Sequence, residues 1–171
     1  MRLAVGDLVV YGAHGAGQVA AREARKDDGD EQTVIVLSLA GGLSVELPLE
    51  RAERLLRPLA DEREIARIGH VLCGEGTVSK EAWLTRRRDA REKLKDAVGL
   101  AEIIRDGNAR ELSNASRSGP SLAPGELELV RQARSLLTRE LSLSRGVEGD
   151  EASAWIDRQL EQAACNASGE E

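Results

Sequence analysis

The stretch TVIVLSLAGGLSVELPL, residues 33–49, decides the fold of the first third of this chain. It opens with TVIVLSLA (33–40), a run of β-branched and aliphatic residues that is typical of a strand, and then breaks at Gly41 and Gly42. In LSVELPL (43–49) apolar and polar residues alternate, which indicates a strand with one buried face. The stretch therefore predicts two strands joined by a tight glycine turn.

Further strand signals lie upstream of this pair. LVVY (8–11) precedes the glycine-rich GAHGAG (12–17), and QVAAREAR (18–25) resembles an exposed strand that ends at the turn signal DDGD (27–30). Four or five short strands in so short a segment predict a small, strongly bent antiparallel barrel. The glycine-rich segment has neither GxGxxG spacing nor a Walker lysine, and it leads into a strand, so we interpret it as a β corner and not as a phosphate loop.

From Pro58 onward the pattern is helical, with apolar residues at helical spacing and an acidic first turn after Asp61. The sequence predicts helices at 61–73, from Ser79 to about 98, at 100–112, at 126–144 and at 150–164. NASRSGPSLAPG (114–125) is expected to be a loop. We therefore expect an α+β chain, with a β domain at 1–57, a compact all-helical domain at 59–165 and a flexible tail at 166–171.

The charge of the chain is unevenly distributed. The chain carries 24 Lys and Arg against 30 Asp and Glu, a net charge of −6, which argues against a general nucleic-acid binder. The one basic island is 79–97, with seven basic and four acidic residues, whereas 146–171 holds one basic and seven acidic residues. Any contact with nucleic acid should therefore be local.

The residues that usually carry chemistry are few. Cys73 and Cys165 are far apart and His14 and His70 are isolated, with no CxxC and no clustered acid pair. We expect two reduced thiols, no metal, no cofactor, no catalytic residues and no enzymatic activity. No apolar run is long enough to span a bilayer, so we expect a soluble, intracellular protein.

The basic island contains EAWLTRRRD (81–89), in a chain with no Phe, one Tyr and two Trp. On a helix that continues to 98, Trp83 shares a face with Ala90 and Leu94, but Arg87 falls on that face too. One interpretation is that Trp83 packs inward while Arg87 extends to the edge. The other is that Trp83 projects beyond the packed body to meet a partner. The second tryptophan, Trp155, accompanies apolar residues of the last helix, and we interpret it as structural.

Four segments in register resemble the CarD/CdnL family of bacterial RNA polymerase-binding transcription regulators. They are VGDLVVYGAHGAGQV (5–19), LSVELPLERAERL (43–55), AWLTRRRDAREKL (82–94) and LAPGELELVRQARSLLTREL (122–141). The resemblance implies a Tudor-like barrel that docks on the β subunit of RNA polymerase and a helical domain at the upstream edge of the promoter bubble. There the family's tryptophan wedges into the minor groove, so Trp83 is the implied wedge, and Arg86, Arg87 and Arg88 are its implied phosphate contacts.

In the barrel, the resemblance implies that Arg25 contacts polymerase, together with the strand residues Val45, Glu46 and Leu47. Glu46 stands where relatives carry a second polymerase-contacting arginine, so the charge there is reversed and the chain is a divergent member.

The resemblance thus implies a monomeric regulator in the cytoplasm, located at the nucleoid through RNA polymerase, that stabilises the promoter open complex. Three or four phosphate contacts give a salt slope of roughly −3, which is weak, so we expect promoter DNA to be bound only within the polymerase complex. The alternative function is a CarD-like protein-interaction adaptor that has lost its DNA contact, with Trp83 in the core.

Overall fold

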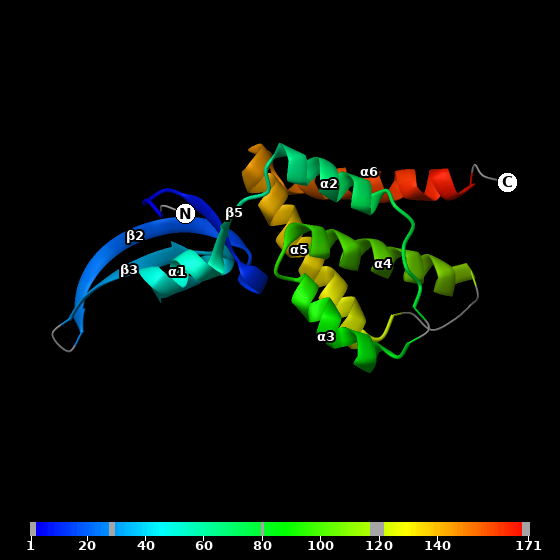
Figure 1. The fold of residues 1–171 in the computed structure, drawn as a ribbon. Helices are drawn as coiled ribbons and strands as arrows, with labels where there is room; N and C mark the ends of the chain where they lie inside the picture. Colours follow the sequence, from blue (N-terminus) through cyan, green and yellow to red (C-terminus); the bar gives the residue numbers. More distant parts are fainter. Residues whose placement is uncertain (1–2, 28–29, 80, 117–121, 169–171) are drawn as a thin grey trace. The chain divides into compact units, whose positions relative to one another are not determined.

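The chain divides into two compact units, Met1–Leu59 and Ala60–Glu171. The computed structural model describes residues 3–27, 30–79, 81–116 and 122–168. The first unit is built on a sheet and the second only of helices (Figure 1). The fold class is therefore α+β, as the sequence predicts.

The sheet of the first unit has five antiparallel strands in the order β4–β3–β2–β1–β5. Their bounds are β1 Leu8–Tyr11, β2 Ala16–Asp27, β3 Asp30–Ser38, β4 Ser44–Pro48 and β5 Leu56–Pro58. The long β2–β3 hairpin is strongly curved (Figure 1), and the register of β2 shifts between Val19 and Ala21, where an irregularity bends the strand. This bent sheet agrees with the Tudor-like architecture. The middle of the expected 27–30 turn, residues 28 and 29, lies outside the described residues.

The alternation of the opening stretch sets the core of this unit. Ile35, Leu37 and Leu39 all point inward and are buried. Short 3-10 turns at Gly12–His14 and Ala40–Gly42 make the two glycine corners. The other buried members of this core are Leu3, Val9, Val19, Leu47, Ala52 and Leu56.

The sequence prediction of strands and turns throughout residues 1–57 was wrong for α1, Leu49–Leu55. Pro48 occupies the N-cap of this helix and ends β4, because proline has no N–H to donate to a continuing ladder. Ala52, one turn into the helix, is fully buried against the sheet. The chain then re-enters the sheet as β5, which pairs with β1.

The second unit contains five helices in the part of the chain that the structure describes. They are α2 Glu62–Leu72, α3 Trp83–Lys93, α4 Ala97–Ser116, α5 Pro124–Arg145 and α6 Gly149–Ser168. The Asp61 carboxylate caps α2 by accepting from the Glu64 N–H at 2.8 Å. Gly146, with φ 64°, ends α5 in the left-handed conformation. α6 stays helical to Ser168, inside the segment expected to be a tail, and 117–121 of the expected loop lie outside the described residues.

The helix expected from Ser79 to about 98 is divided in the structure. α3 starts at Trp83, and its C-cap is Leu94, after which α4 starts at Ala97. The Asp96 carboxylate accepts from the Gly99 N–H at 2.8 Å and so begins the new helix. A Cβ at Gly99 would lie 2.3 Å from the Lys93 carbonyl oxygen. Gly99 therefore lies inside α4 and permits the sharp turn, instead of ending a helix as its sequence position suggests.

The helical core lies between α2, α4, α5 and α6, and α3 packs on α4 and α5. Its buried apolar side chains include Ile68, Leu72, Leu100, Ile104, Leu129, Leu137, Leu141 and Ile156. Trp155 faces Gly69 of α2, in keeping with its structural interpretation. Among the described helices, none combines the length and the apolar character that a membrane crossing needs.

Candidate nucleic-acid interface

Helix α3 carries the tryptophan and the arginines on which the sequence analysis focused. The Ser79 hydroxyl accepts from the Glu81 N–H at 3.1 Å, which shapes the turn before the helix, and Ala82 takes the N-cap. No residue of Trp83–Lys93 is fully buried. The helix therefore lies on the surface of the unit, with an inner side toward α4 and α5 and an outer side toward solvent.

On the inner side, the Trp83 indole is half-buried against the start of α5. A Cβ at Gly125 would lie 3.0 Å from the indole Nε1, so the glycine leaves the space that the ring occupies. The guanidinium carbon of Arg86 lies 5.7 Å from the centroid of the indole, within the range of a cation–π contact. Trp83 is thus neither a fully buried core residue nor a ring that projects clear of the body.

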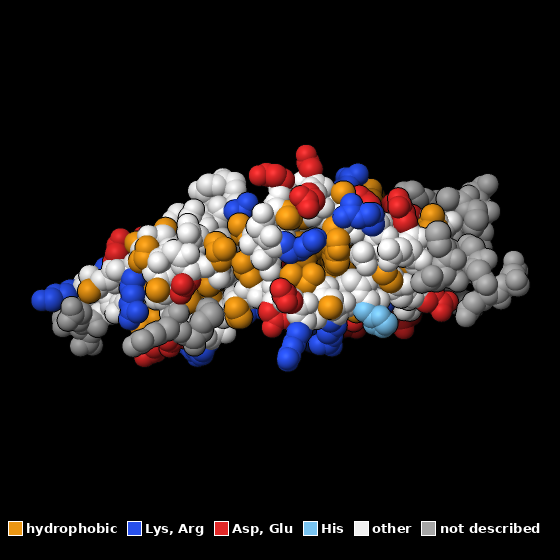
Figure 2. Space-filling model, turned by 90° about the horizontal axis from the view of Figure 1, so that it is seen from above, with side chains coloured by type: hydrophobic (Ala, Val, Ile, Leu, Met, Phe, Trp, Pro, Cys, Tyr) orange, Lys and Arg blue, Asp and Glu red, His pale blue; other side chains and the backbone are white. Residues whose placement is uncertain are grey.

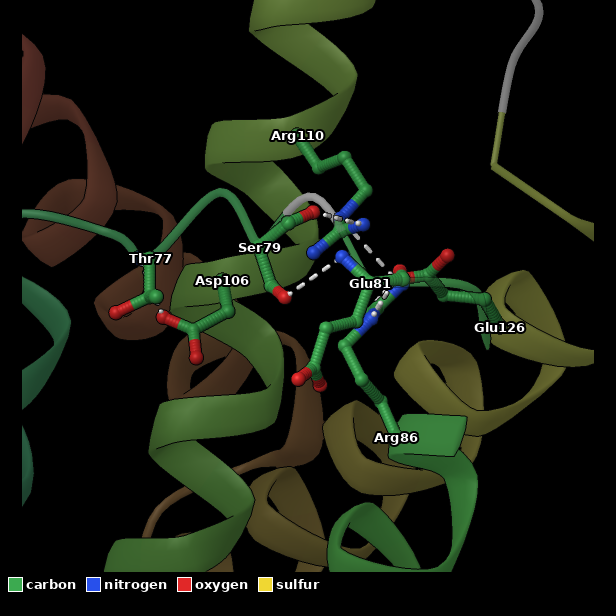
Figure 3. Close-up of polar contacts among 7 residues, drawn as sticks. All are labelled: Thr77, Ser79, Glu81, Arg86, Asp106, Arg110 and Glu126. Carbon is green, nitrogen blue, oxygen red and sulfur yellow. Dashed lines mark hydrogen bonds and ion pairs between the residues drawn. The ribbon is translucent and has the colours of Figure 1, made fainter. Parts of the chain in front are cut away.

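The Glu126 carboxylate joins three helices beneath this ring. Its Oε1 lies 3.2 Å from Nη1 of Arg86 on α3 and 3.2 Å from Nε of Arg110 on α4 (Figure 3). The side chains of Arg86, Arg110 and Glu126 are only 19%, 12% and 9% exposed. Arg86 also donates to the Glu81 carbonyl at 3.1 Å, and Arg110 donates to the Ser79 carbonyl at 3.4 Å. The two arginines therefore fasten the turn before α3 as well as the helix itself.

A cavity of about 220 Å³ opens between α3, α4 and α5. Its lining includes Trp83 and Arg86 of α3, Asp106 and Arg110 of α4 and Glu126 of α5. Asp106 accepts from the Thr77 N–H at 2.9 Å, so it holds the segment that leads to α3. Asp106 and Arg86 thus help to hold α3 and the turn before it, whereas the buried Nε of Arg110 has an ion-pair contact with Glu126 but no hydrogen-bond partner among the described residues.

The outer side of α3 has a different character. Leu84 is 72% exposed, and Arg87, Arg88 and Arg91 are exposed around it. Nearby Glu92 is paired with Lys95, and that hydrogen bond lowers the pKa of the Glu92 carboxyl. The exposed surface of α3 is therefore locally basic with an apolar residue within it. On the face drawn in Figure 2, the charges of the described residues are mixed in sign and form no broad basic patch.

In the first unit, Arg25 on β2 and Glu46 on β4 form a two-bond ion pair. The Arg25 Nη1 and Nη2 atoms donate to the two Glu46 oxygens at 2.7 and 2.9 Å, and Nη2 also donates to Glu23 at 3.0 Å. These bonds, above all those to Glu46, raise the pKa of Arg25, and Arg25 in turn holds the pKa of Glu46 below its usual range. Both side chains are about half exposed, at 47% and 50%. Glu46, which carries the opposite charge to the arginine expected there, is thus the ion-pair partner of Arg25.

The two other residues expected at this surface differ in exposure. Val45 is partly buried and packs against the core, and Leu47 is 4% exposed and belongs to the core. The alternation of β4 points the Leu47 side chain into the core, and the expected polymerase contact at Leu47 stays a prediction. At this position only the backbone of the edge strand β4 faces outward for a partner.

The structure also separates the four residues expected to meet DNA. Trp83 and Arg86 come together on the inner side, whereas Arg87 and Arg88 are exposed. The sequence geometry placed Arg87 on the tryptophan face and left Arg86 available, and the structure reverses these roles because Glu126 draws Arg86 inward. The N-terminal half of α3 therefore does not project beyond the packed body as one of the two interpretations had it.

Three residues of the site had no role in the sequence analysis. They are Glu126, Arg110 and Leu84. The sequence does contain a signal for Glu126, because an acidic residue in the first turn of a helix interacts favourably with the positive end of the helix dipole, and Glu126 follows Pro124 at the start of α5. Its contact with α3, 40 residues away, depends on tertiary packing. Helical geometry could have indicated the exposure of Leu84, which lies about 100° around the axis from Trp83.

His14 and Cys73 each contact residues of the fold. The His14 ring stacks on Tyr11 with centroids 4.8 Å apart. The Cys73 thiol lies near Gln159 of α6, and burial raises its pKa. Within the described ranges, no cluster of His, Cys, Asp and Glu is suited to hold a metal ion.

The first unit is a bent, Tudor-like antiparallel sheet, and the second is a helical unit with an indole at the start of a basic surface helix. This combination is typical of the class of two-unit regulators that the sequence resembles. Comparison with family models matches residues 3–60 to the CarD-like/TRCF RID domain and residues 67–157 to the CarD C-terminal domain. The chain belongs to the CarD/CdnL family. It is a CarD-type, RNA polymerase-interacting transcription regulator, from a family of transcription factors that are not enzymes.

Proposed function

We propose that this protein binds the β subunit of RNA polymerase through its first unit and stabilises the promoter open complex through Trp83 and the arginines of α3. The observation that carries the proposal is the placement of a half-buried indole at the first residue of a surface helix whose outer side is basic. The protein acts as a monomer in the cytoplasm, at the nucleoid through polymerase, and needs no cofactor or catalytic group.

Docking on polymerase is assigned to Arg25, Glu46 and the edge of β4. An edge strand offers backbone donors and acceptors to a partner, and β4 is an edge of the described sheet. Arg25 is exposed but already held by Glu46. A polymerase acid must therefore compete with Glu46 for this guanidinium. We expect binding weaker than with two unopposed arginines.

The DNA contact is assigned to Trp83 as the wedge, with Arg87 and Arg88 on phosphates. Arg86 holds the indole and its turn in place, through Glu126 and the Glu81 carbonyl, instead of serving as a third phosphate contact. An apolar or aromatic insert stabilises an unstacked base step that costs a few kcal/mol to open. A net gain of about 1.4 kcal/mol in the open complex is a tenfold shift in its equilibrium.

This DNA contact should be effective only next to polymerase. Two phosphate contacts from Arg87 and Arg88 give a salt slope of roughly −2, and the net charge of −6 opposes binding. Docking of the first unit raises the local concentration of the second to about the millimolar range, so that a weak contact is occupied. The protein alone should therefore bind promoter DNA poorly.

The test is the lifetime of the open complex on a ribosomal-type promoter, with polymerase and the full chain. We expect Trp83→Ala, and separately Arg87→Ala with Arg88→Ala, to shorten the lifetime. The control is Arg63→Ala with Arg67→Ala, two exposed arginines about one turn apart on α2, which removes the same number of positive charges. Equal lifetimes for wild type and Trp83→Ala would remove the wedge role.

A second candidate is an adaptor that binds polymerase or another protein without touching DNA. The observation in its favour is the engagement of the inner side of α3, where Trp83 contacts α5 and Arg86 pairs with Glu126. In that case a pull-down with the polymerase β lobe or another partner retains the protein, but no α3 variant changes the lifetime of the open complex.

A further inference from the structure

The outer side of α3 contains an apolar side chain that the fold does not use. Leu84 is 72% exposed, the largest exposure among the large hydrophobic side chains of the described residues. The next most exposed, Val5 at 62%, lies near the start of the chain and outside any helix or strand. Leu84 contributes little to burial, so a polar residue would serve the helix equally well.

Helical geometry places this leucine among cations. At about 100° per residue, Arg88 and Arg91 lie within roughly 40° of Leu84 around the helix axis, and Arg87 lies within roughly 60°. All three arginines are exposed. Trp83, by contrast, lies about 100° away and faces α5. The outer side of α3 is therefore a stripe of three guanidinium groups around one leucine, which we call the leucine–arginine stripe (Leu84, Arg87, Arg88 and Arg91).

The charge of this stripe selects its occupant. Each guanidinium can donate to phosphate oxygens. The acid at the rim, Glu92, pairs mainly with Lys95 and attracts Arg88 more weakly. Proteins that bind the minor groove combine such cations with an apolar side chain, often leucine, that enters between base steps. A protein groove would bury Leu84 equally well but would have to satisfy three cations, whereas nucleic acid offers a regular row of anions beside apolar base faces.

We propose that Leu84 is a second apolar insert at the junction of duplex and melted DNA, and that Arg91 is a phosphate contact beside Arg87 and Arg88. The inference rests on the proposed function, because polymerase must bring α3 to the junction. Trp83 and Leu84 are consecutive but point in different directions, so they contact different bases or strands at the junction. The arginines of the stripe hold the backbone on either side of Leu84.

The test compares Leu84→Ser with a matched control, Leu112→Ser. Leu112 is 57% exposed on α4 of the same unit, and its neighbours one turn away, Asn108 and Ala109, are uncharged. With polymerase and the full chain, we expect Leu84→Ser to shorten the open-complex lifetime about tenfold, which corresponds to about 1.4 kcal/mol of lost apolar contact. Leu112→Ser should leave the lifetime unchanged.

Two further arms make the result specific. An abasic site at the upstream junction removes the base on which Leu84 would pack, so it should abolish the difference between wild type and Leu84→Ser. Arg91→Gln should shorten the lifetime and lower the magnitude of the salt slope by about one. Loss of the same lifetime with Leu112→Ser, or a Leu84→Ser effect that persists at the abasic junction, would overturn the proposal.

The Trp83→Ala and Arg87→Ala/Arg88→Ala variants distinguish a failure of the Leu84 role from a failure of the proposed function. If they shorten the lifetime and Leu84→Ser does not, the role of Leu84 is refuted and the proposed function stands. If none of the variants changes the lifetime, although the protein binds polymerase, the proposed function itself fails and the leucine–arginine stripe loses its DNA partner.

Discussion

Replacement of Glu126 by glutamine tests how α3 is held. The carboxylate contacts Arg86 and Arg110, whose side chains are only 19% and 12% exposed. Glu126→Gln keeps the size and one acceptor oxygen but removes the charge that balances two guanidinium groups. Loss of one partner from a buried ion pair costs about 3–5 kcal/mol in other proteins. Since some solvent reaches both arginines and glutamine still accepts a hydrogen bond, we expect about 2 kcal/mol here.

The assay is thermal and urea unfolding of the full chain, read at the helical unit. A loss of about 2 kcal/mol lowers the midpoint by roughly 4–8 °C for a chain of this size. The matched control is Glu128→Gln, a change of the same kind at an exposed residue of the same helix. Because the Glu126 pair holds Arg86 over the indole, Trp83 emission should also shift to longer wavelength in a Trp155→Phe background. Unfolding free energies that agree within about 0.5 kcal/mol for the two glutamine variants would refute this account of α3.

The remaining predictions concern one residue each. Gly125→Ala should push the Trp83 ring outward, since the new Cβ would lie 3.0 Å from Nε1, and iodide quenching of Trp83 emission should increase. Glu46→Gln should strengthen binding of the polymerase β lobe in a biosensor assay, because it releases Arg25. The Glu46 carboxyl should titrate below its ordinary range by NMR, so the ion pair persists as pH falls through the usual carboxylate pKa and is lost only as pH falls through the lowered one. The Cys73 thiol, whose pKa is raised by burial, should react slowly with iodoacetamide near neutral pH in the folded protein.

Controls for these predictions lie close to each site. Gly149→Ala, at a position with open space around it, should not alter Trp83 quenching. Glu23→Gln removes the weaker partner of Arg25 and should strengthen polymerase binding less than Glu46→Gln does. In Arg25→Gln the Glu46 titration should return to the ordinary carboxylate range, and an unchanged midpoint would contradict the assigned cause. Urea should accelerate alkylation of Cys73, and equal rates in folded and unfolded protein would rule out protection by burial.

Local sequence patterns were sufficient for most elements of the fold. The alternation in 33–49 places Ile35 and Leu37 in the core, and helical spacing locates α2, α5 and α6 to within a few residues. The errors have long-range causes. α1 forms where Ala52 docks on the sheet, and the boundary between α3 and α4 depends on how closely the Lys93 backbone approaches Gly99. Neither contact leaves a periodic trace in the sequence.

For the candidate site, the sequence predicted the location but not the orientation of each side chain. Its location on the helix that begins at Trp83 follows from the resemblance and from the basic island. The orientation of each side chain does not, because Arg86 turns inward only once α5 brings the Glu126 carboxylate beside it. Periodicity alone favoured Arg87 for that position. A carboxylate 40 residues away decides between two neighbouring arginines, and only the folded chain brings it there.

Both surfaces that matter for the proposed function thus contain an arginine neutralised from within, Arg25 by Glu46 and Arg86 by Glu126. An external anion that takes over such a guanidinium must replace a carboxylate already in place, so its net gain is smaller than for an arginine that only water contacts. On the DNA side, the exposed Arg87, Arg88 and Arg91 remain, with a salt slope of roughly −3 if all three reach phosphates. Neither unit then binds strongly by itself. Two weak contacts joined in one chain still give a stable complex where polymerase and melted DNA lie together, because each raises the effective concentration of the other. Under the proposed function, the internal ion pairs would therefore restrict the action of this regulator to the assembled promoter complex.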